Sequence, residues 1–315
     1  MSSSRTMSLA IVGAGRVGRA LGKLLRDRGW RIAAVVTCSS ATARAAVRAI
    51  GAGKPFAHLT PEILSADVIL LTTPDSAIAA TAAKLAQVTR GIPPRPGVVG
   101  ATRLALSPAE GRVARSEWGG RIVLHTSGAL DSCVLAPLTR LGAAVGSLHP
   151  LQTFGARSIP SLRGVLFTLE GDPRAARVAR RIARQLGGIP IEIPARAKPA
   201  YHAAGAFAAA HMLSLIEGGT QMLVKLGFPK KQAQRGLLRM ARQMLSNLET
   251  LGPRASWSGP VSRGDFSTVE KHMVALAPFA TEFSRAHAAM LLLSARVLAA
   301  DNGATLRRLK RMLKD

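Results

Sequence analysis

Aromatic residues, cysteines and acidic residues are all scarce in this chain of 315 residues. Aromatic side chains make up only 4% of it, which argues against the stacking surfaces by which single-strand nucleic-acid binders hold bases. Two cysteines, Cys38 and Cys133, are too few for a disulfide scaffold and fit a reducing compartment. We therefore expect a cytoplasmic protein.

Long apolar runs are also lacking. The most apolar stretch, residues 203–216, is interrupted by His211 and is shorter than the ~20 residues that span a bilayer. It is predicted to be a buried helix. The N-terminal segment lacks the apolar core of a secretory signal, so no membrane association is expected.

Acidic residues number 17 against 43 lysines and arginines, which gives a net charge of +26. The excess is spread over both halves of the chain. This excess positive charge can attract anionic cofactors and substrates through its electrostatic field. The alternative is that the charged residues form only a solvated surface. Nonspecific contact with nucleic-acid phosphates would weaken steeply with salt. We expect no specific nucleic-acid partner; the alternative, a nucleic-acid-associated protein, requires selective binding at physiological salt.

The most informative stretch is LAIVGAGRVGRALG at residues 9–22. A short apolar strand pattern leads into glycines at G-x-G-x-x-G spacing, and a helical pattern follows. In a dinucleotide site the first glycine makes the turn, the second admits the pyrophosphate, and the third lets the helix pack on the strand. The predicted cofactor residues are Gly13, Ala14, Gly15, Arg16, Val17 and Gly18. The alternative is a glycine turn without a ligand.

The second predicted strand, residues 31–37, bears on which dinucleotide is bound. An NAD-binding fold carries a carboxylate at the end of this strand. Here hydroxyl groups follow it, on Thr37, Ser39 and Ser40, and Arg44 lies in the next predicted helix. Hydroxyls and a guanidinium suit a 2′-phosphate, so the sequence favours NADP(H) over NAD(H). The alternative is that Arg44 is an ordinary surface residue.

Strand and helix patterns alternate as far as residue 193, which predicts an α/β domain with a doubly wound, mostly parallel sheet. Its strand at residues 66–72 ends in Thr73 and Pro74, which we expect to line the cofactor crevice. Helical patterns alone follow from residue 198. We therefore predict a Rossmann dinucleotide-binding domain at 1–195 and an all-α domain at 196–315. Residues 89–120 are predicted to be a surface insertion with a short helix at 108–115.

Polar residues at strand ends are the candidates for chemistry. Ser127 and His149 follow successive strands, at the edge where such sheets bind ligands. A histidine there can donate or accept a proton near neutral pH. We predict His149 as the general acid–base, oriented by Ser127, which can alternatively hold the nicotinamide amide. The competing interpretation is that His149 only ends a strand before Pro150; His125 is a weaker candidate.

Further candidates lie downstream. Lys198 and His202 are four residues apart, so they share one face of a helix, and we predict that one of them polarises the substrate oxygen or binds a carboxylate. Gln152, close after His149, and Arg263, in the turn-rich loop 259–265, are predicted substrate contacts, because a guanidinium suits an anionic group. That loop can alternatively be a plain connection between helices. No metal-ligand spacing is present in the sequence.

Five blocks together carry a resemblance to a known family: GAGRVG at 13–18, HTSGAL at 125–130, GSLHPLQTF at 146–154, KPAYHAAGAFAAAH at 198–211 and GPVSRGD at 259–265. They resemble the family that joins a Rossmann-like domain to a C-terminal domain of unknown function (DUF2520). The wider class includes 6-phosphogluconate dehydrogenase, pyrroline-5-carboxylate reductase, prephenate dehydrogenase and deazaflavin-dependent NADP reductases. In that class the helical domain dimerises and closes the cofactor cleft, which implies a homodimer here.

The resemblance implies a nicotinamide oxidoreductase. The blocks around Ser127 and His149 resemble those of prephenate dehydrogenases, in which the histidine bonds to the reacting hydroxyl and the serine supports it. Lys198 resembles the lysine that opens the helical domain of hydroxyacid dehydrogenases. Those enzymes carry asparagines on the helix that follows, whereas this chain reads Ala-Ala-Ala-His at 208–211.

The sequence thus predicts an NADP-dependent oxidoreductase. Hydride would pass between NADP(H) and a carbonyl or imine carbon of a small, anionic substrate. The alternative is a sensor or scaffold protein that binds NADP(H) without turnover.

Overall fold

The computed structural model describes residues 6–88, 117–156 and 158–313. Contacts divide the chain into two compact units, Met1–Phe207 and Ala208–Asp315. The division falls inside the long helix expected after residue 198, so residues 196–207 belong to the first unit. The short helix predicted at 108–115 lies outside the described residues.

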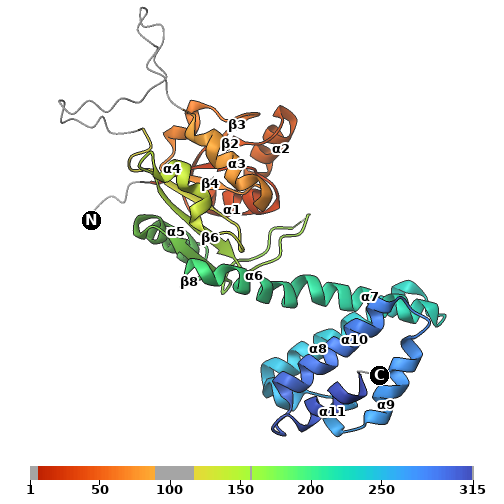
Figure 1. The fold of residues 1–315 in the computed structure, drawn as a ribbon. Helices are drawn as coiled ribbons and strands as arrows, with labels where there is room; N and C mark the ends of the chain where they lie inside the picture. The colour runs from red at the N-terminus through yellow and green to blue at the C-terminus, as the bar shows by residue number, and fades with distance from the viewer. Residues whose placement is uncertain (1–5, 89–116, 157, 314–315) are drawn as a thin grey trace, which may run out of the picture. The chain divides into compact units, whose positions relative to one another are not determined.

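Within the described residues, the first unit holds an eight-stranded sheet of order β3-β2-β1-β4-β5-β6-β7-β8 (Figure 1). Its strands are β1 (Ser8–Val12), β2 (Arg31–Val36), β3 (Lys54–Phe56), β4 (Val68–Leu71), β5 (Ile122–His125), β6 (Ala144–Pro150), β7 (Leu166–Gly171) and β8 (Ile189–Glu192). Among these strands every pairing is parallel except that of β6 with β7. The strand order reverses between β1 and β4. This confirms the doubly wound, mostly parallel sheet.

Helices cover both faces of this sheet, which explains why β1 after Ser8 and the whole of β4 are apolar. They are α1 (Arg16–Arg26), α2 (Ser40–Ile50), α3 (Asp75–Ala86), α4 (Ala136–Thr139) and α5 (Pro173–Gln185). One core cluster joins the sheet to α1, α2 and α5 through Leu21, Ile50 and Ile182. The other joins it to α3 and α4 through Ile78 and Leu138.

The antiparallel pair β6–β7 depends on two glycines that face each other, Gly146 and Gly171. Gly171 has a φ of +125°, which is accessible mainly to glycine. A Cβ atom on Gly171 would collide with the Cα of Gly146, and one on Gly146 would lie 2.8 Å from the carbonyl oxygen of Glu170. The two backbones therefore meet where neither can carry a side chain.

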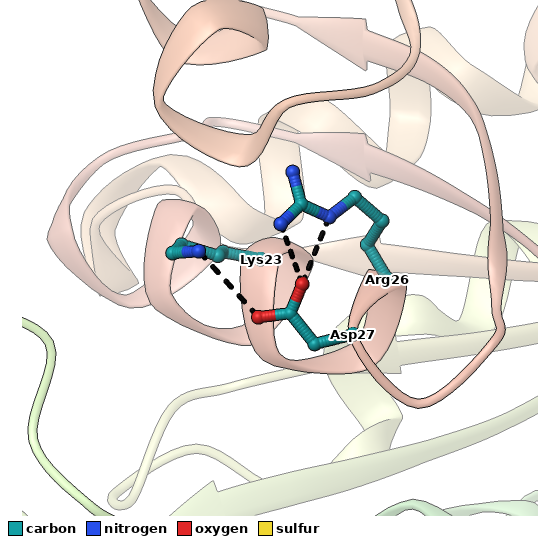
Figure 2. Close-up of polar contacts among 3 residues, drawn as sticks. All are labelled: Lys23, Arg26 and Asp27. Atoms are coloured by element: carbon teal, nitrogen blue, oxygen red, sulfur yellow. Dashed lines mark hydrogen bonds and ion pairs between the residues drawn. The ribbon is translucent and has the colours of Figure 1, made fainter.

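Helix α1 ends in a small charged group (Figure 2). Asp27 accepts a hydrogen bond from Nε of Arg26 at 3.0 Å and lies 3.5 Å from Nζ of Lys23. The Arg26 side chain lowers the pKa of Asp27. Cations in the last turn also complement the helix dipole. Because the group is exposed, it contributes little to stability.

The end of the first unit and the described part of the second are built of helices. Helix α6 (Lys198–Ala206) leads through a π-helical turn (Phe207–His211) into α7 (Met212–Lys225). Then follow α8 (Lys230–Ser256), α9 (Phe266–Leu276), α10 (Thr281–Leu298) and α11 (Ala304–Met312). The all-α C-terminal region is thereby confirmed. The expected single helix at 201–226 instead starts at Lys198 and contains the π turn.

The described part of the second unit has a small core: Val261, Phe266, Val269, Ala295, Leu306 and Leu309. Many large apolar side chains of α7, α8 and α10 are exposed instead. None of the helices in the described residues combines the length and apolar character needed to cross a membrane.

Candidate functional site

The glycine turn joins β1 to α1 beside the end of β4. Gly13 has a φ of +86°, and a Cβ there would lie 2.5 Å from Cγ2 and 2.7 Å from the backbone nitrogen of Thr73. Thr72 donates a hydrogen bond from Oγ1 to the carbonyl oxygen of Gly13 at 2.7 Å, and a Cβ on Gly18 would collide with that hydroxyl. Two of the three glycines are therefore required by the packing of the turn itself.

Gly15 is different, because its surroundings are open. A Cβ there would meet nothing closer than the carbonyl oxygen of Gly13, at 3.9 Å. Helix α1 begins at Arg16, and in the described structure no side chain caps its first turn. Next to this turn, the hydroxyl of Thr73 is buried without a hydrogen-bond partner among the described residues. An open backbone at a helix N-terminus and an unpaired hydroxyl fit a pyrophosphate. Ala14 is buried, Arg16 is exposed, and Val17 packs against the core.

Hydrogen bonds made by hydroxyl groups stabilise the loop after β2. Ser39 caps α2 by accepting a hydrogen bond from the backbone of Thr42 at 3.2 Å. Thr37 bonds to the hydroxyl of Thr42 at 2.6 Å and donates to the carbonyl oxygen of Ser39 at 3.1 Å. Ser40 and Arg44 are exposed at the start of α2. These two side chains are free to meet a ligand, whereas those of Thr37 and Ser39 also shape the loop.

His125 and Ser127 lie at the end of β5. The backbone N–H of Ser127 donates to Nδ1 of His125 at 3.2 Å, so Nε2 carries the proton and donates to the carbonyl oxygen of Asp131 at 3.1 Å. Burial, and then the nearby Lys198, lower the pKa of His125 to about 4. Both nitrogens of this neutral, fully buried ring are engaged, so His125 has a structural role.

Ser127 connects the strand ends to α3. Its hydroxyl donates to the carboxylate of Asp75 at 2.7 Å and accepts from the backbone N–H groups of Ala129 and Leu130 at 3.1 and 2.9 Å. Asp75 opens α3 directly after Thr73 and Pro74, and Pro74 is the N-cap residue of that helix. The Asp75–Ser127 bond thus ties the loop after β4 to the end of β5.

Lys198 is completely buried at the start of α6. Its ammonium donates to the carbonyl oxygen of Ser127 at 3.0 Å and to Oγ of Ser147, on β6, at 2.8 Å. Burial lowers the pKa of Lys198 to about 8, against the opposing influence of carboxylates such as Glu170. The ammonium anchors α6 to the strand ends and lies behind the site rather than at a surface that a ligand reaches.

His149 lies at the end of β6, and among the described residues only one of its ring nitrogens, Nδ1, makes a hydrogen bond. Its Nδ1 bonds to the hydroxyl of Tyr201 at 2.8 Å, and the His202 ring lies 6.1 Å away between ring centroids. A Cβ on Gly128 would lie 2.9 Å from Nε2 of His149 and 2.7 Å from the His202 ring. Burial, and then the nearby Lys198 and His202, lower the pKa of His149 to about 4. The ring is therefore neutral at physiological pH.

The structure gathers four predicted residues, Ser127, His149, Lys198 and His202, in one cluster of the first unit. Ser127 bonds to Asp75, however, and it is Tyr201 that bonds to the His149 ring. Gln152 is exposed after β6, and its side-chain oxygen accepts from the backbone of Thr153. Arg263 is exposed in the second unit, in a short turn after which Asp265 caps α9, as expected of a connecting loop.

Three residues of the cluster carried no clear sequence signal: Asp75, Ser147 and Tyr201. Ser147 stands two residues before His149 in a strand, so the period of two places both on one face, which is a usable hint. Asp75 and Tyr201 reach the cluster only through the fold. Across the described ranges, no three histidine, cysteine or acidic side chains gather as a metal site requires.

Residues 2–111 match the Rossmann-like domain family, and residues 165–291 match the family described as Domain of unknown function (DUF2520). No curated protein matches the chain.

Solved structures share the fold over most of their length. A Bacteroides fragilis protein provisionally designated an NADP oxidoreductase is 17% identical, with a TM-score of 0.68 over 90% of this chain and 96% of its own. Protein TM1727 of Thermotoga maritima is 21% identical, with a TM-score of 0.64 over 98% and 100%. An Aspergillus terreus reductive aminase, in complex with NADPH and ethyl-5-oxohexanoate, is 14% identical, with a TM-score of 0.58 over 98% and 94%. At these identities the likeness establishes the fold.

Proposed function

We propose that this chain, which joins a Rossmann-like domain to a DUF2520 domain, is an NADP(H)-dependent oxidoreductase. Hydride passes between the nicotinamide and a carbonyl or imine carbon of a small, anionic substrate. The observation that carries this proposal is the open Gly15 turn, connected to the His149 cluster through the loop at Thr73 and the Asp75–Ser127 bond. The NADPH complex of the reductive aminase, which has the same fold, supports the choice of cofactor.

Each part of the cofactor has candidate residues on this chain. The turn at residues 13–18 holds the pyrophosphate at the N-terminus of α1. Arg44 and Ser40, with the hydroxyl loop of Thr37 and Ser39, take the 2′-phosphate. Thr73 and Pro74 line the crevice. The bound nicotinamide supplies or accepts the hydride, and the protein positions the reactants.

The His149 cluster supplies acid–base chemistry. Nε2 of His149 exchanges a proton with the substrate oxygen or nitrogen, and His202 contacts the substrate beside it. Ser127 holds the strand end in place through Asp75. The Lys198 ammonium, although buried, favours negative charge that develops on a substrate oxygen. Gln152 is the candidate for binding the anionic group of the substrate.

We also propose a homodimer formed through the second unit. Helix α8 carries a stripe of exposed apolar side chains: Met240, Met244, Leu248 and Leu251, which are 42% to 66% exposed. Their spacing places them along one face of a helix, and none of them belongs to the small core of the second unit. A second copy that covers this stripe would bury it. Sedimentation equilibrium should report a dimer, and Met244→Glu with Leu248→Glu should dissociate it, while Arg239→Glu should not.

A reducing, cytoplasmic location fits the two thiols. Cys38 and Cys133 are both free and exposed, which an oxidising compartment would not preserve.

The test is calorimetric titration with NADPH and with NADH at moderate salt, followed by turnover assays on carbonyl and imine substrates. We expect NADPH to bind at least about tenfold more tightly than NADH, roughly 1.4 kcal/mol. His149→Ala should abolish turnover and leave NADPH binding intact. Failure of both cofactors to bind would refute the proposal. Tight NADPH binding without turnover across the substrate panel would favour the sensor or scaffold alternative.

A further inference from the structure

One contact at the centre of the cluster joins two elements far apart in the chain. The hydroxyl of Tyr201, on α6, lies 2.8 Å from Nδ1 of His149, on β6. The two rings are nearly perpendicular, at 86°, with centroids 5.5 Å apart. Within the part of the chain that the structure describes, this hydroxyl is the hydrogen-bond partner of the His149 ring. The ring is therefore held from one side by Tyr201.

The other side of the ring packs against the backbone of Gly128. A Cβ on that residue would lie 2.9 Å from both Cε1 and Nε2 of His149, so the ring fits there only because the residue is glycine. His125 makes an instructive contrast, because its two nitrogens are both bonded to backbone groups and its tautomer is thereby fixed. Of the two histidines, only His149 keeps one nitrogen for a ligand.

Tyr201 is itself held in place. It stands three residues after Lys198, whose buried ammonium bonds to Ser127 and Ser147. Three residues are nearly one helical turn, so the buried Lys198 lies on the same face of α6 as Tyr201. Burial raises the pKa of Tyr201, so its hydroxyl stays protonated at neutral pH.

We propose that Tyr201 is a positioning residue of this site. Its hydroxyl fixes the imidazole of His149 through Nδ1 and so leaves Nε2 to meet the reacting oxygen or nitrogen of the substrate. This inference rests on the oxidoreductase function proposed above.

The phenol suits this role because its O–H can both donate and accept. When it donates to Nδ1, Nε2 carries the ring proton and donates a hydrogen bond to a substrate carbonyl. When it accepts from Nδ1, the lone pair of Nε2 is free to take the proton of a substrate hydroxyl. In that direction the substrate O–H bond breaks, the proton goes to Nε2, and the hydride leaves the carbon for the oxidised nicotinamide. The imidazolium that forms keeps its Nδ1–H on the tyrosine oxygen.

The first test needs no turnover, because Tyr201 is the only tyrosine in the chain. Labelling tyrosine with ¹³C at Cζ gives one NMR resonance that reports the hydrogen bonding of this hydroxyl. We expect His149→Phe to shift that resonance and His58→Ala, a change at an exposed histidine outside the cluster, to leave it in place. If the chemical shift of this resonance is the same in His149→Phe as in the wild type, the inference is overturned.

The second test is kinetic. Tyr201→Phe keeps the ring and removes only the hydroxyl. We expect kcat to fall roughly tenfold to a hundredfold, since a misdirected acid–base group loses part of its typical contribution. The KM of the substrate and the Kd of NADPH should stay within about twofold, which a general loss of structure would not produce. An unchanged kcat, with the NMR shift present, would show that the contact does not position His149.

The two proposals fail in different ways. If NADPH does not bind the wild-type protein, the oxidoreductase function falls and the catalytic part of this inference falls with it. If NADPH binds and turnover occurs, but Tyr201→Phe matches the wild type, only the role of Tyr201 is refuted.

Discussion

Nζ of Lys198 lies 2.8 Å from Oγ of Ser147, and neither residue has exposed surface. The bond closes a separation of 51 residues and places a positive charge inside the protein, between the ends of β5 and β6 and the start of α6. That charge lowers the pKa of both neighbouring imidazoles, those of His125 and His149.

Replacing the ammonium should therefore change the titration of the histidines. We expect Lys198→Met to raise the pKa of His149 and of His125 from about 4. Both should remain below their ordinary value of 6.5, because burial is the larger cause of the shift. NMR titration of the imidazole protons measures this. Lys84→Met, at an exposed lysine of α3, is the control. Histidine titrations that do not move in Lys198→Met would contradict the assigned influence of the ammonium.

The same histidines predict a dependence of stability on acid. In the folded state each takes up a proton only near pH 4, whereas in the unfolded chain each does so near pH 6.5. Between these values the unfolded state holds more protons, so stability falls as the pH is lowered from 6.5 to 4. Each ring contributes up to roughly 3 kcal/mol of this loss. Urea unfolding at several pH values measures it. His149→Phe should flatten the slope, and a profile that is level in the wild type would refute the assignment.

A substitution at Gly15 tests whether the glycine turn binds the cofactor or has only a structural role. Gly15→Ala adds a methyl group whose nearest protein atom would lie 3.9 Å away. The φ of −74° and ψ of −152° of this residue lie at the border of the conformations open to alanine. We expect a small decrease in melting temperature and an NADPH affinity lowered at least about tenfold, because the methyl group blocks the approach of the pyrophosphate. Gly236→Ala, on an open face of α8, should leave NADPH binding untouched. Equal NADPH affinity in Gly15→Ala and wild type would mean that the turn does not contact the cofactor.

Arg44 is our candidate for the residue that sets the preference between the two dinucleotides. Arg44→Ala should weaken NADPH binding about tenfold, roughly 1.4 kcal/mol, and leave NADH binding unaffected, because only NADPH carries the 2′-phosphate. Arg48→Ala, one turn further along α2 and also exposed, is the matched control. Calorimetric titration of both variants with both cofactors gives the comparison. A loss of equal size for NADH would assign Arg44 to a general electrostatic effect.

Much of the first unit can be predicted from local patterns. Residues 9–12 of β1 and all of β4 are apolar, because both faces of a parallel sheet are covered. The glycines at 13, 15 and 18 predict the turn. Backbone conformation or close packing restricts Gly13 and Gly18 to glycine, whereas the surroundings of Gly15 are open. Ser127 and His149 can be placed in one region, because parallel strands end at the same edge.

The contacts that give the cluster its chemistry could not be predicted in this way. Asp75 and Ser127 are 52 residues apart, as are His149 and Tyr201. Each pair forms only when a helix end and a strand end meet in the folded chain. The burial of Lys198 has the same origin, since a lysine at the start of a helix is ordinarily solvated. A single sequence carries no period or spacing that would report these pairings.

The facing glycines of β6 and β7 restrict how this sheet can change. At Gly171 a side chain would collide with the backbone of Gly146, and at Gly146 it would crowd the carbonyl oxygen of Glu170. A substitution at either position cannot be rescued by a smaller residue at the other, because the other is already glycine. The point where the sheet turns antiparallel is therefore closed to stepwise mutation, and variation in the strands around it has to proceed with these two positions unchanged.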